Sequence, residues 1–166
     1  MVLGIMRINP HLQEGIVPYD NLRKGRFSEA DRAYFVTTVL ANREQAIFKD
    51  FYCARLIIRH MRELDESGYI NSMAWVVMPD HIHWLFQLQD KKPLAEVMRL
   101  FKAGVAYKVN QQLGRKGALW QRYYYDHALR DNEDIRGIAR YIVANPLRAG
   151  LVNHIAEYPH WDAIWL

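Results

Sequence analysis

The stretch Ile70–Leu88, INSMAWVVMPDHIHWLFQL, holds two apolar runs that are separated by the dipeptide Pro79-Asp80. Ile70–Met78 and His81–Leu88 are both rich in β-branched and aromatic residues, which favour strands. Proline followed by aspartate is typical of a tight turn. The stretch therefore predicts a hairpin of two antiparallel strands, and the rest of the chain is interpreted around it.

The second strand of this hairpin begins with the pattern His81-Ile82-His83. Side chains alternate between the two faces of a strand, so both imidazoles point the same way, roughly 6.5 Å apart along the strand. Ile82 then faces a core on the opposite side. Two imidazoles at this spacing can bind one metal ion, although two half-exposed strand histidines without a metal would give the same pattern.

Periodic segments on either side of the hairpin complete the order β-α-β-β-α-β, which a further helix follows. This order predicts an α+β, ferredoxin-like fold: an antiparallel sheet of four or more strands, two helices on one face, and a C-terminal helix. The flanking elements are a strand at Tyr34–Leu40, a helix capped by Asp50 that runs to about Glu66, a helix over Pro93–Leu113, a strand over Leu119–Arg130, and a helix that Asp131 opens and Pro146 ends.

The chain has 166 residues, which fits a single domain over residues 1–166. We expect an N-terminal arm over 1–30 and a C-terminal tail over 147–166 that packs on the core. The one cysteine, Cys53, excludes a disulfide framework and a cysteine-based zinc site, and it favours a reducing cytoplasm. No run approaches the ~20 apolar residues that span a bilayer, so no membrane partner is expected.

Positive charge is concentrated in one part of the chain. The net charge of the chain is +4. Positions 99–130 hold seven basic residues and one acidic residue and sum to +6, so the rest of the chain sums to −2. Aromatic residues are interleaved with these cations, a combination that suits single-stranded nucleic acid; a solvated face above an aromatic core is the alternative. The candidate DNA-binding residues are Arg99, Lys102, Lys108, Arg115, Lys116, Arg122 and Arg130.

The last predicted helix carries the second candidate for chemistry, Tyr141 in the segment ARYIVANP. On a helical wheel Tyr141 lies about 110° from the centre of the apolar stripe, so it is on the flank of the helix. Asn145 follows four residues later on the same flank. The pair could be a nucleophile and a metal ligand, or a boundary tyrosine with an asparagine that caps the helix.

Taken together, these features resemble the HUH single-tyrosine transposases, specifically the REP-associated tyrosine transposases of bacteria. The resemblance covers essentially the whole chain. His-hydrophobic-His after W-V-V-x-P-[DE], together with a Y-I-x-x-N-P helix, is specific when both occur. The matching segments are GRFSEADRAYFVTTVL (Gly25–Leu40), AWVVMPDHIHWLF (Ala74–Phe86), LWQRYYYDHALR (Leu119–Arg130) and DIRGIARYIVANPLRAGLV (Asp134–Val152).

The resemblance implies a role for each residue of the two motifs. His81 and His83 match the family's metal-binding pair, and Asn145 matches the third ligand of a divalent Mg²⁺ or Mn²⁺ ion. Tyr141 matches the nucleophile. The implied activity is metal-dependent cleavage and rejoining of single-stranded DNA through a 5′-phosphotyrosine intermediate, at REP-type hairpins. It also implies a bacterial, nucleoid-associated protein that acts as a monomer or a homodimer.

Two other functions are compatible with the residues. One is a non-catalytic module that binds single-stranded nucleic acid on a ferredoxin-like sheet, although such RNA-binding domains carry stacking aromatics where this chain has His81 and His83. The other is a metal-dependent phosphodiesterase that uses water, in which Tyr141 is merely structural.

Overall fold

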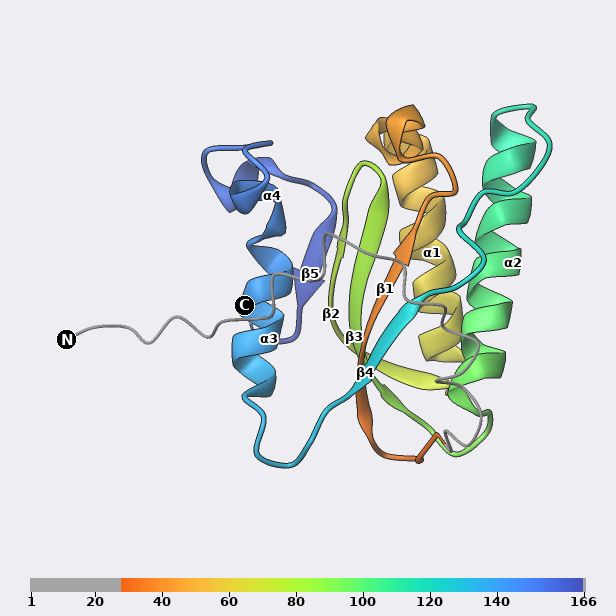
Figure 1. Cartoon of the computed structure of the whole chain (residues 1–166). Coiled ribbons are helices and arrows are strands. Elements are labelled where there is room, and N and C mark those ends of the chain that lie inside the picture. The colour runs from red at the N-terminus through yellow and green to blue at the C-terminus, as the bar shows by residue number, and fades with distance from the viewer. Residues whose placement is uncertain (1–27, 166) are drawn as a thin grey trace.

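The computed structural model describes residues 28–165, which form a five-stranded antiparallel sheet with helices on both faces (Figure 1). The strand order β4-β1-β3-β2-β5 contains the ferredoxin-like order of the first four strands, so the predicted fold class is confirmed. The strands are β1 (Ala33–Val39), β2 (Ile70–Val77), β3 (His81–Leu88), β4 (Tyr125–Ala128) and β5 (Trp161–Ala163). The helices are α1 (Phe51–Glu66), α2 (Leu94–Gln112), α3 (Ile135–Val143) and α4 (Asn145–Arg148), with 3-10 turns η3 (Arg43–Gln45), η4 (Ile47–Lys49) and η5 (Ile155–Glu157).

The predicted hairpin of β2 and β3 lies at the centre of the sheet. β3 begins at His81 as expected, and β2 ends at Val77, one residue before the predicted end. The backbone N–H of Met78 donates to the carbonyl of His81 at 2.8 Å and closes the turn. The N–H of Leu40 donates to the carbonyl of Asp80 at 2.9 Å, so the turn is also tied to the end of β1.

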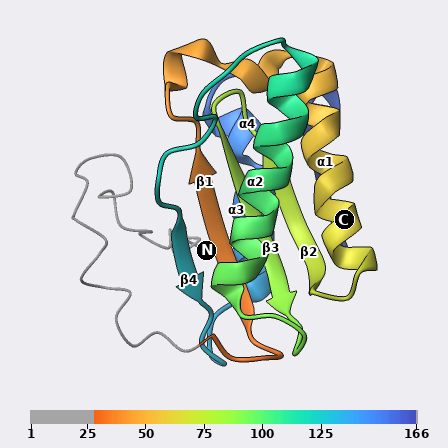
Figure 2. The same ribbon diagram turned by 90° about the vertical axis from the view of Figure 1, so that its right-hand side faces the viewer.

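Two hydrophobic cores lie on opposite faces of the sheet. α1 and α2 cover one face, as predicted, and α3 covers the other (Figures 1 and 2). Residues of β3 alternate between the cores: Ile82 and Trp84 are buried under α1 and α2, and Leu85 is buried on the side of α3. The even period of the strand therefore sends the two histidines to the face of α3.

The first helix starts where the sequence predicts. Asp50 is the N-cap, and its carboxylate accepts a hydrogen bond from the backbone N–H of Cys53 at 2.8 Å. This hydrogen bond holds the pKa of Asp50 below its ordinary value. The predicted apolar face of the helix is buried in the core; it consists of Ala54, Ile57, Met61 and Leu64.

The fourth strand is shorter than predicted, four residues instead of the expected Leu119–Arg130. Trp120 forms an isolated bridge with Leu40, and the chain then leaves the ladder. The ammonium of Lys102 donates to the carbonyls of Gln121 and Arg122 at 2.8 and 2.9 Å, which engages these backbone groups outside the sheet.

The tyrosine-bearing helix begins at Ile135, not at Asp131 as predicted. Glu133 accepts from the backbone N–H of Arg130 at 2.6 Å and from Nε2 of His127 at 2.8 Å, which holds the preceding residues in a turn against β4. Asp134 is the N-cap, with the N–H of Gly137 donating to it at 2.9 Å. Pro146 does not end α3 directly but stands in the first turn of α4.

Residues 159–165 return to the sheet, where β5 pairs with β2 through Ala74, Trp75 and Val76. The expected arm over 1–30 lies almost entirely outside the described residues, and one domain over 1–166 stays a prediction. None of the helices within 28–165 is long and apolar enough to cross a membrane.

Candidate active site

His81 and His83 lie side by side on the face of the sheet that α3 covers. Their ring centroids are 4.8 Å apart. The ring of His83 also lies 5.4 Å from that of Phe35, a residue of the core beneath α3. The strand period thus produces the pair of imidazoles that the sequence predicts.

The Nδ1 atoms of the two histidines are both occupied by polar neighbours. His81 Nδ1 lies 2.6 Å from Oδ1 of Asp80, and His83 Nδ1 lies 2.7 Å from Oγ1 of Thr37 on the adjacent strand. Neither Nε2 atom has a hydrogen-bond partner among residues 28–165. Within the described residues, each ring therefore keeps one nitrogen available to a ligand.

Burial and charge set the protonation of these groups. Burial lowers the pKa of His83 to about 3, and repulsion from His81 in its protonated form acts in the same direction, so the His83 imidazole is neutral at physiological pH and able to bind a metal. Burial alone would raise the pKa of Asp80. Hydrogen bonds from His81 and Arg43 outweigh that effect and lower the pKa of Asp80 to about 2, so the carboxylate is ionised.

Tyr141 belongs to α3, the helix that packs on the face of the sheet where the two histidines lie. Its ring is half-buried against the core, and its centroid lies 6.4 Å from the ring of His83. The guanidinium of Arg148, on α4, lies 5.1 Å from the centroid of the Tyr141 ring. A guanidinium in this place can pair with a phosphate oxygen. The structure therefore brings the predicted nucleophile to the predicted metal pair.

Asn145 has the capping role that the sequence left open. Its Nδ2 donates to the carbonyls of Tyr141 and Ile142 at 2.9 and 3.2 Å, which satisfies the C-terminal end of α3. These bonds use the amide nitrogen and leave Oδ1 as an acceptor. No hydrogen bond joins Asn145 to His81 or His83 within the part of the chain that the structure describes.

The donor set fits a divalent cation. The imidazole rings of His81 and His83 lie on one face of the sheet with their centroids 4.8 Å apart, and Asn145 begins α4, the helix that follows the one that carries Tyr141. Imidazole and amide donors suit first-row divalent ions, and oxygen donors suit Mg²⁺ and Mn²⁺. Within residues 28–165 no group of three or more His, Cys, Asp and Glu side chains could hold a metal, so a third protein ligand beside His81 and His83 would be of another residue type, such as the predicted Asn145.

Comparison with known proteins gives the family. The profile of the family described as "Transposase IS200 like" matches residues 30–145. The chain belongs to the IS200-like transposase family. This confirms the resemblance that the two motifs carry, and it makes the chain a transposase, a DNA-processing enzyme.

Individual relatives of this transposase agree with the family. It is 28% identical over 133 residues to the REP-associated tyrosine transposase of Escherichia coli (strain K12), covering 76% of this chain and 73% of the relative. A solved structure of a REP-associated tyrosine transposase bound to a REP hairpin superimposes with a TM-score of 0.68 at 24% identity, covering 82% of this chain and 79% of that chain. The structural likeness shows the fold.

Three of the seven basic residues of the transposase lie on the far side of the sheet from Tyr141. Arg99, Lys102 and Lys108 belong to α2, which packs on the opposite face of the sheet (Figure 1). Arg99 pairs with Glu96 at 2.7 Å, and Lys108 pairs with Glu63 of α1 at 2.6 Å. Their binding to DNA stays a prediction, and the structure does not bring these α2 residues together with the tyrosine.

The other four basic residues belong to the part of the chain that connects α2 to α3. Arg115 contacts Asn110 and Gln45, and Lys116 follows it in the same loop. The guanidinium of Arg122 lies 5.2 Å from the ring centroid of Tyr123. Arg130 follows β4 in the segment that leads to α3, and this segment passes from one layer of the fold to the other.

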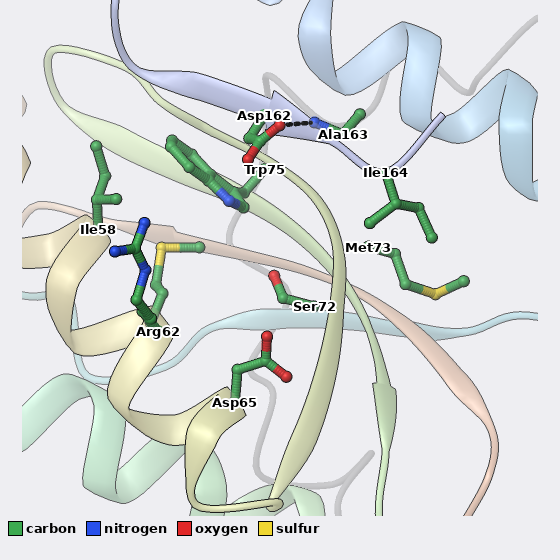
Figure 3. Close-up of a pocket in the computed structure, with 10 residues that line it drawn as sticks. Ile58, Arg62, Asp65, Ser72, Met73, Trp75, Asp162, Ala163 and Ile164 are labelled. Atoms are coloured by element: carbon green, nitrogen blue, oxygen red, sulfur yellow. Dashed lines mark hydrogen bonds between the residues drawn. The ribbon is translucent and has the colours of Figure 1, made fainter. Parts of the chain in front are cut away.

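Two hollows in the surface contain none of the proposed catalytic or metal-binding residues. A groove of about 450 Å³ between α2 and residues 118–124 includes Arg99, Lys102 and Arg122. A smaller hollow of about 200 Å³ lies between α1, β2 and β5, where Arg62 and Asp65 face Asp162 across Trp75 (Figure 3). The face of the sheet with His81, His83 and Tyr141 therefore lies outside both hollows.

Sequence reasoning missed three residues beside the candidate site: Thr37, Asp80 and Arg148. Asp80 was interpreted only as part of a turn, although its position next to His81 was a usable signal. Thr37 could have been found only from the register of β1 against β3, which pairs it with His83. Arg148 reaches Tyr141 because the chain turns between α3 and α4.

Proposed function

We propose that the chain cleaves and rejoins single-stranded DNA by covalent attack of Tyr141 on a phosphodiester. The observation that supports this most directly is that Tyr141 lies beside the histidine pair: its ring centroid is 6.4 Å from that of His83, and the His83 centroid is 4.8 Å from that of His81. A nucleophile beside a site for a cation is the arrangement that phosphoryl transfer needs.

In this reaction the Oη atom of Tyr141 forms a bond to phosphorus, and the bond from phosphorus to the 3′ oxygen breaks. The phenol loses a proton and the departing 3′ oxygen gains one, which leaves a 5′-phosphotyrosine and a free 3′-OH. Because the phosphodiester energy is kept in the covalent link, attack by a 3′-OH reverses the step and rejoins the strand.

His81, His83 and Asn145 are the residues that would hold the divalent cation, Mg²⁺ or Mn²⁺. When bound, the ion would polarise the scissile phosphate and stabilise negative charge in the transition state. His83 is suited to this because its imidazole stays neutral. Asn145 keeps its oxygen available because its nitrogen is engaged by the carbonyls of α3. Arg148, over the Tyr141 ring, would pair with a phosphate oxygen.

REP-type hairpin DNA is the proposed substrate, because a relative of similar fold was solved bound to a REP hairpin. The basic residues between α2 and α3 would contact the DNA backbone. A bacterial, nucleoid-associated location and a monomer or homodimer stay predictions. The alternative of a non-catalytic binding module is less well supported, because α3 packs on the sheet face that such modules leave open for stacking.

The test is a covalent-adduct assay with labelled single-stranded DNA that carries a REP-type hairpin, in the presence of Mn²⁺. We expect the full-length protein to acquire a labelled, denaturation-resistant adduct. Tyr141→Phe removes the nucleophilic oxygen, so the adduct should fall below detection. Tyr107→Phe is the matched control, because Tyr107 is an exposed tyrosine on α2, and it should form adduct at the wild-type level.

The three functions give different results in this assay. Loss of adduct in both Tyr141→Phe and His81→Ala supports the proposal. DNA binding without cleavage in the wild type would point to the binding module. Cleavage without an adduct that persists in Tyr141→Phe would point to a phosphodiesterase that uses water.

A further inference from the structure

The carboxylate of Asp80 connects two residues that come from different parts of the chain. Its Oδ1 lies 2.6 Å from Nδ1 of His81, and its Oδ2 accepts a hydrogen bond from Nε of Arg43 at 2.6 Å. Arg43 comes from η3, the turn that follows β1. Both oxygens are therefore engaged, one by the imidazole and one by the guanidinium.

The backbone around Asp80 is held as firmly as its side chain. The carbonyl of Asp80 accepts from the N–H of Leu40 at 2.9 Å, and the carbonyl of Pro79 accepts from the N–H of Phe48 at 3.0 Å. The side chain of Asp80 is 19% exposed, whereas that of Arg43 is 60% exposed. The carboxylate thus has a defined position at the start of β3, from which it faces His81.

We propose that Asp80 is a positioning residue that fixes the tautomer and orientation of His81, and that Arg43 in turn positions Asp80. An ionised carboxylate can only accept a hydrogen bond, so Nδ1 of His81 carries the proton and Nε2 carries the lone pair. A carboxylate behind a metal-binding imidazole orients the ring and raises its basicity.

The two histidines are supported by different chemistry. His81 is backed by a negative charge, and His83 is backed only by the neutral hydroxyl of Thr37 at 2.7 Å. Loss of Asp80 should therefore weaken one ligand and leave the other in place. The inference rests on the proposed function in assigning the Nε2 of His81 to a cation, but the tautomer itself does not depend on that assignment.

The first measurement is Mn²⁺ affinity, by calorimetric titration of the full-length chain with Mn²⁺ alone. Loss of a carboxylate behind a ligating histidine lowers metal affinity about 10- to 100-fold, which is the fall we expect for Asp80→Ala. Asp80→Asn keeps an oxygen that accepts from Nδ1, so it should lose less than Asp80→Ala. Arg43→Ala should shift the affinity in the same direction by a smaller factor.

The control is Arg62→Ala, which removes an exposed arginine of α1 that lies in the hollow of Figure 3. It should bind Mn²⁺ with wild-type affinity. Wild-type affinity in both Asp80→Ala and Arg43→Ala would overturn the proposal. Should Asp80→Ala fail to fold, Arg43→Ala decides the question, because Arg43 is exposed and the carboxylate would remain.

The second measurement is the ¹⁵N chemical shifts of the His81 ring in the metal-free protein. We expect the Nδ1–H tautomer in the wild type and a mixture of tautomers in Asp80→Ala. An Nε2–H tautomer in the wild type would overturn the proposal whether or not the protein binds Mn²⁺. A wild-type protein with the Nδ1–H tautomer but no Mn²⁺ binding would instead contradict the metal assignment of the proposed function and leave the positioning role supported.

Discussion

Neighbouring threonines on β1 have opposite environments. Thr37 faces α3, and its hydroxyl lies 2.7 Å from Nδ1 of His83. Thr38 faces α1 and α2, is 1% exposed, and its hydroxyl has no hydrogen-bond partner within residues 28–165. The alternation of a strand thus gives one hydroxyl a place in the site and leaves the next buried without a partner.

Thr38→Val should stabilise the protein. A buried polar group without a partner costs about 1–3 kcal/mol, and valine has nearly the same shape without the hydroxyl. We expect the free energy of unfolding in urea to rise by about 1 kcal/mol.

Thr37→Val is the matched comparison. It leaves Nδ1 of His83 without its partner, so it should lower the free energy of unfolding. Equal effects of the two substitutions would contradict the different roles assigned to these hydroxyls.

At the scale of elements, the packing of α1 on α2 depends on the absence of a side chain at Gly104. His60 of α1 lies over this position: its Nδ1 is 2.7 Å from Glu63, its Nε2 is 3.2 Å from the carbonyl of Leu100, and its ring stacks on Phe101. A Cβ atom at position 104 would overlap the His60 ring. The glycine inside α2 is therefore explained by close approach of the two helices.

Gly104→Ala should destabilise the protein although alanine is the better helix former by about 1 kcal/mol. Overpacking a well-filled interface costs about 1–3 kcal/mol, and we expect a net loss in that range in urea denaturation.

A double-mutant cycle with His60→Ala separates the two effects. In the His60→Ala background the overlap is gone, so Gly104→Ala should become neutral or stabilising. Destabilisation of the same size in both backgrounds would show that the His60 ring is not the cause.

At the scale of the whole molecule, the C-terminal residues Tyr158 and His160 contact both the end of β2 and the start of α1. The carbonyl of His160 accepts from the N–H of Val77 at 2.9 Å, and Tyr158 Oη donates to the carbonyl of Val77 at 2.7 Å. The His160 ring lies 5.6 Å from that of Phe51 at the start of α1. Its side chain is buried, with Nδ1 unpaired among the residues that the structure describes.

Stability should therefore fall in mild acid. Burial, and then the positive charge of Arg55, lower the pKa of His160 below its ordinary value of 6.5. Below pH 6.5 His160 binds a proton in the unfolded chain but not in the folded chain. The free energy of unfolding is therefore highest above pH 6.5 and falls as the pH is lowered. The loss from one such group is at most about 1.4 kcal/mol per pH unit.

The measurement is the free energy of unfolding between pH 7.5 and 5. His83 contributes in the same direction, because its pKa is lowered too. His160→Gln should flatten the pH dependence without abolishing it. An unchanged slope in this variant would show that His160 titrates equally in the folded and unfolded chains.

Local patterns predicted most elements because their signals lie within a few residues of one another. The β2–β3 hairpin, the Asp50 cap and the buried stripe of α1 follow from strand and helix periods. The predictions that were wrong depended on distant groups. β4 starts only at Tyr125, after Lys102 engages the carbonyls of Gln121 and Arg122, and α3 starts late because Glu133 holds the preceding turn.

The sequence by itself determined the fold class, the shared face of His81 and His83, and the family to which the two motifs belong. Only the tertiary structure decided that Tyr141 meets His83, that Asp80 joins His81 to Arg43, and that the basic α2 lies on the opposite face. The physical reason is that periodicity specifies which way a side chain points within its own element. Contacts between elements depend on register and layer, which are set by the packing of the whole chain.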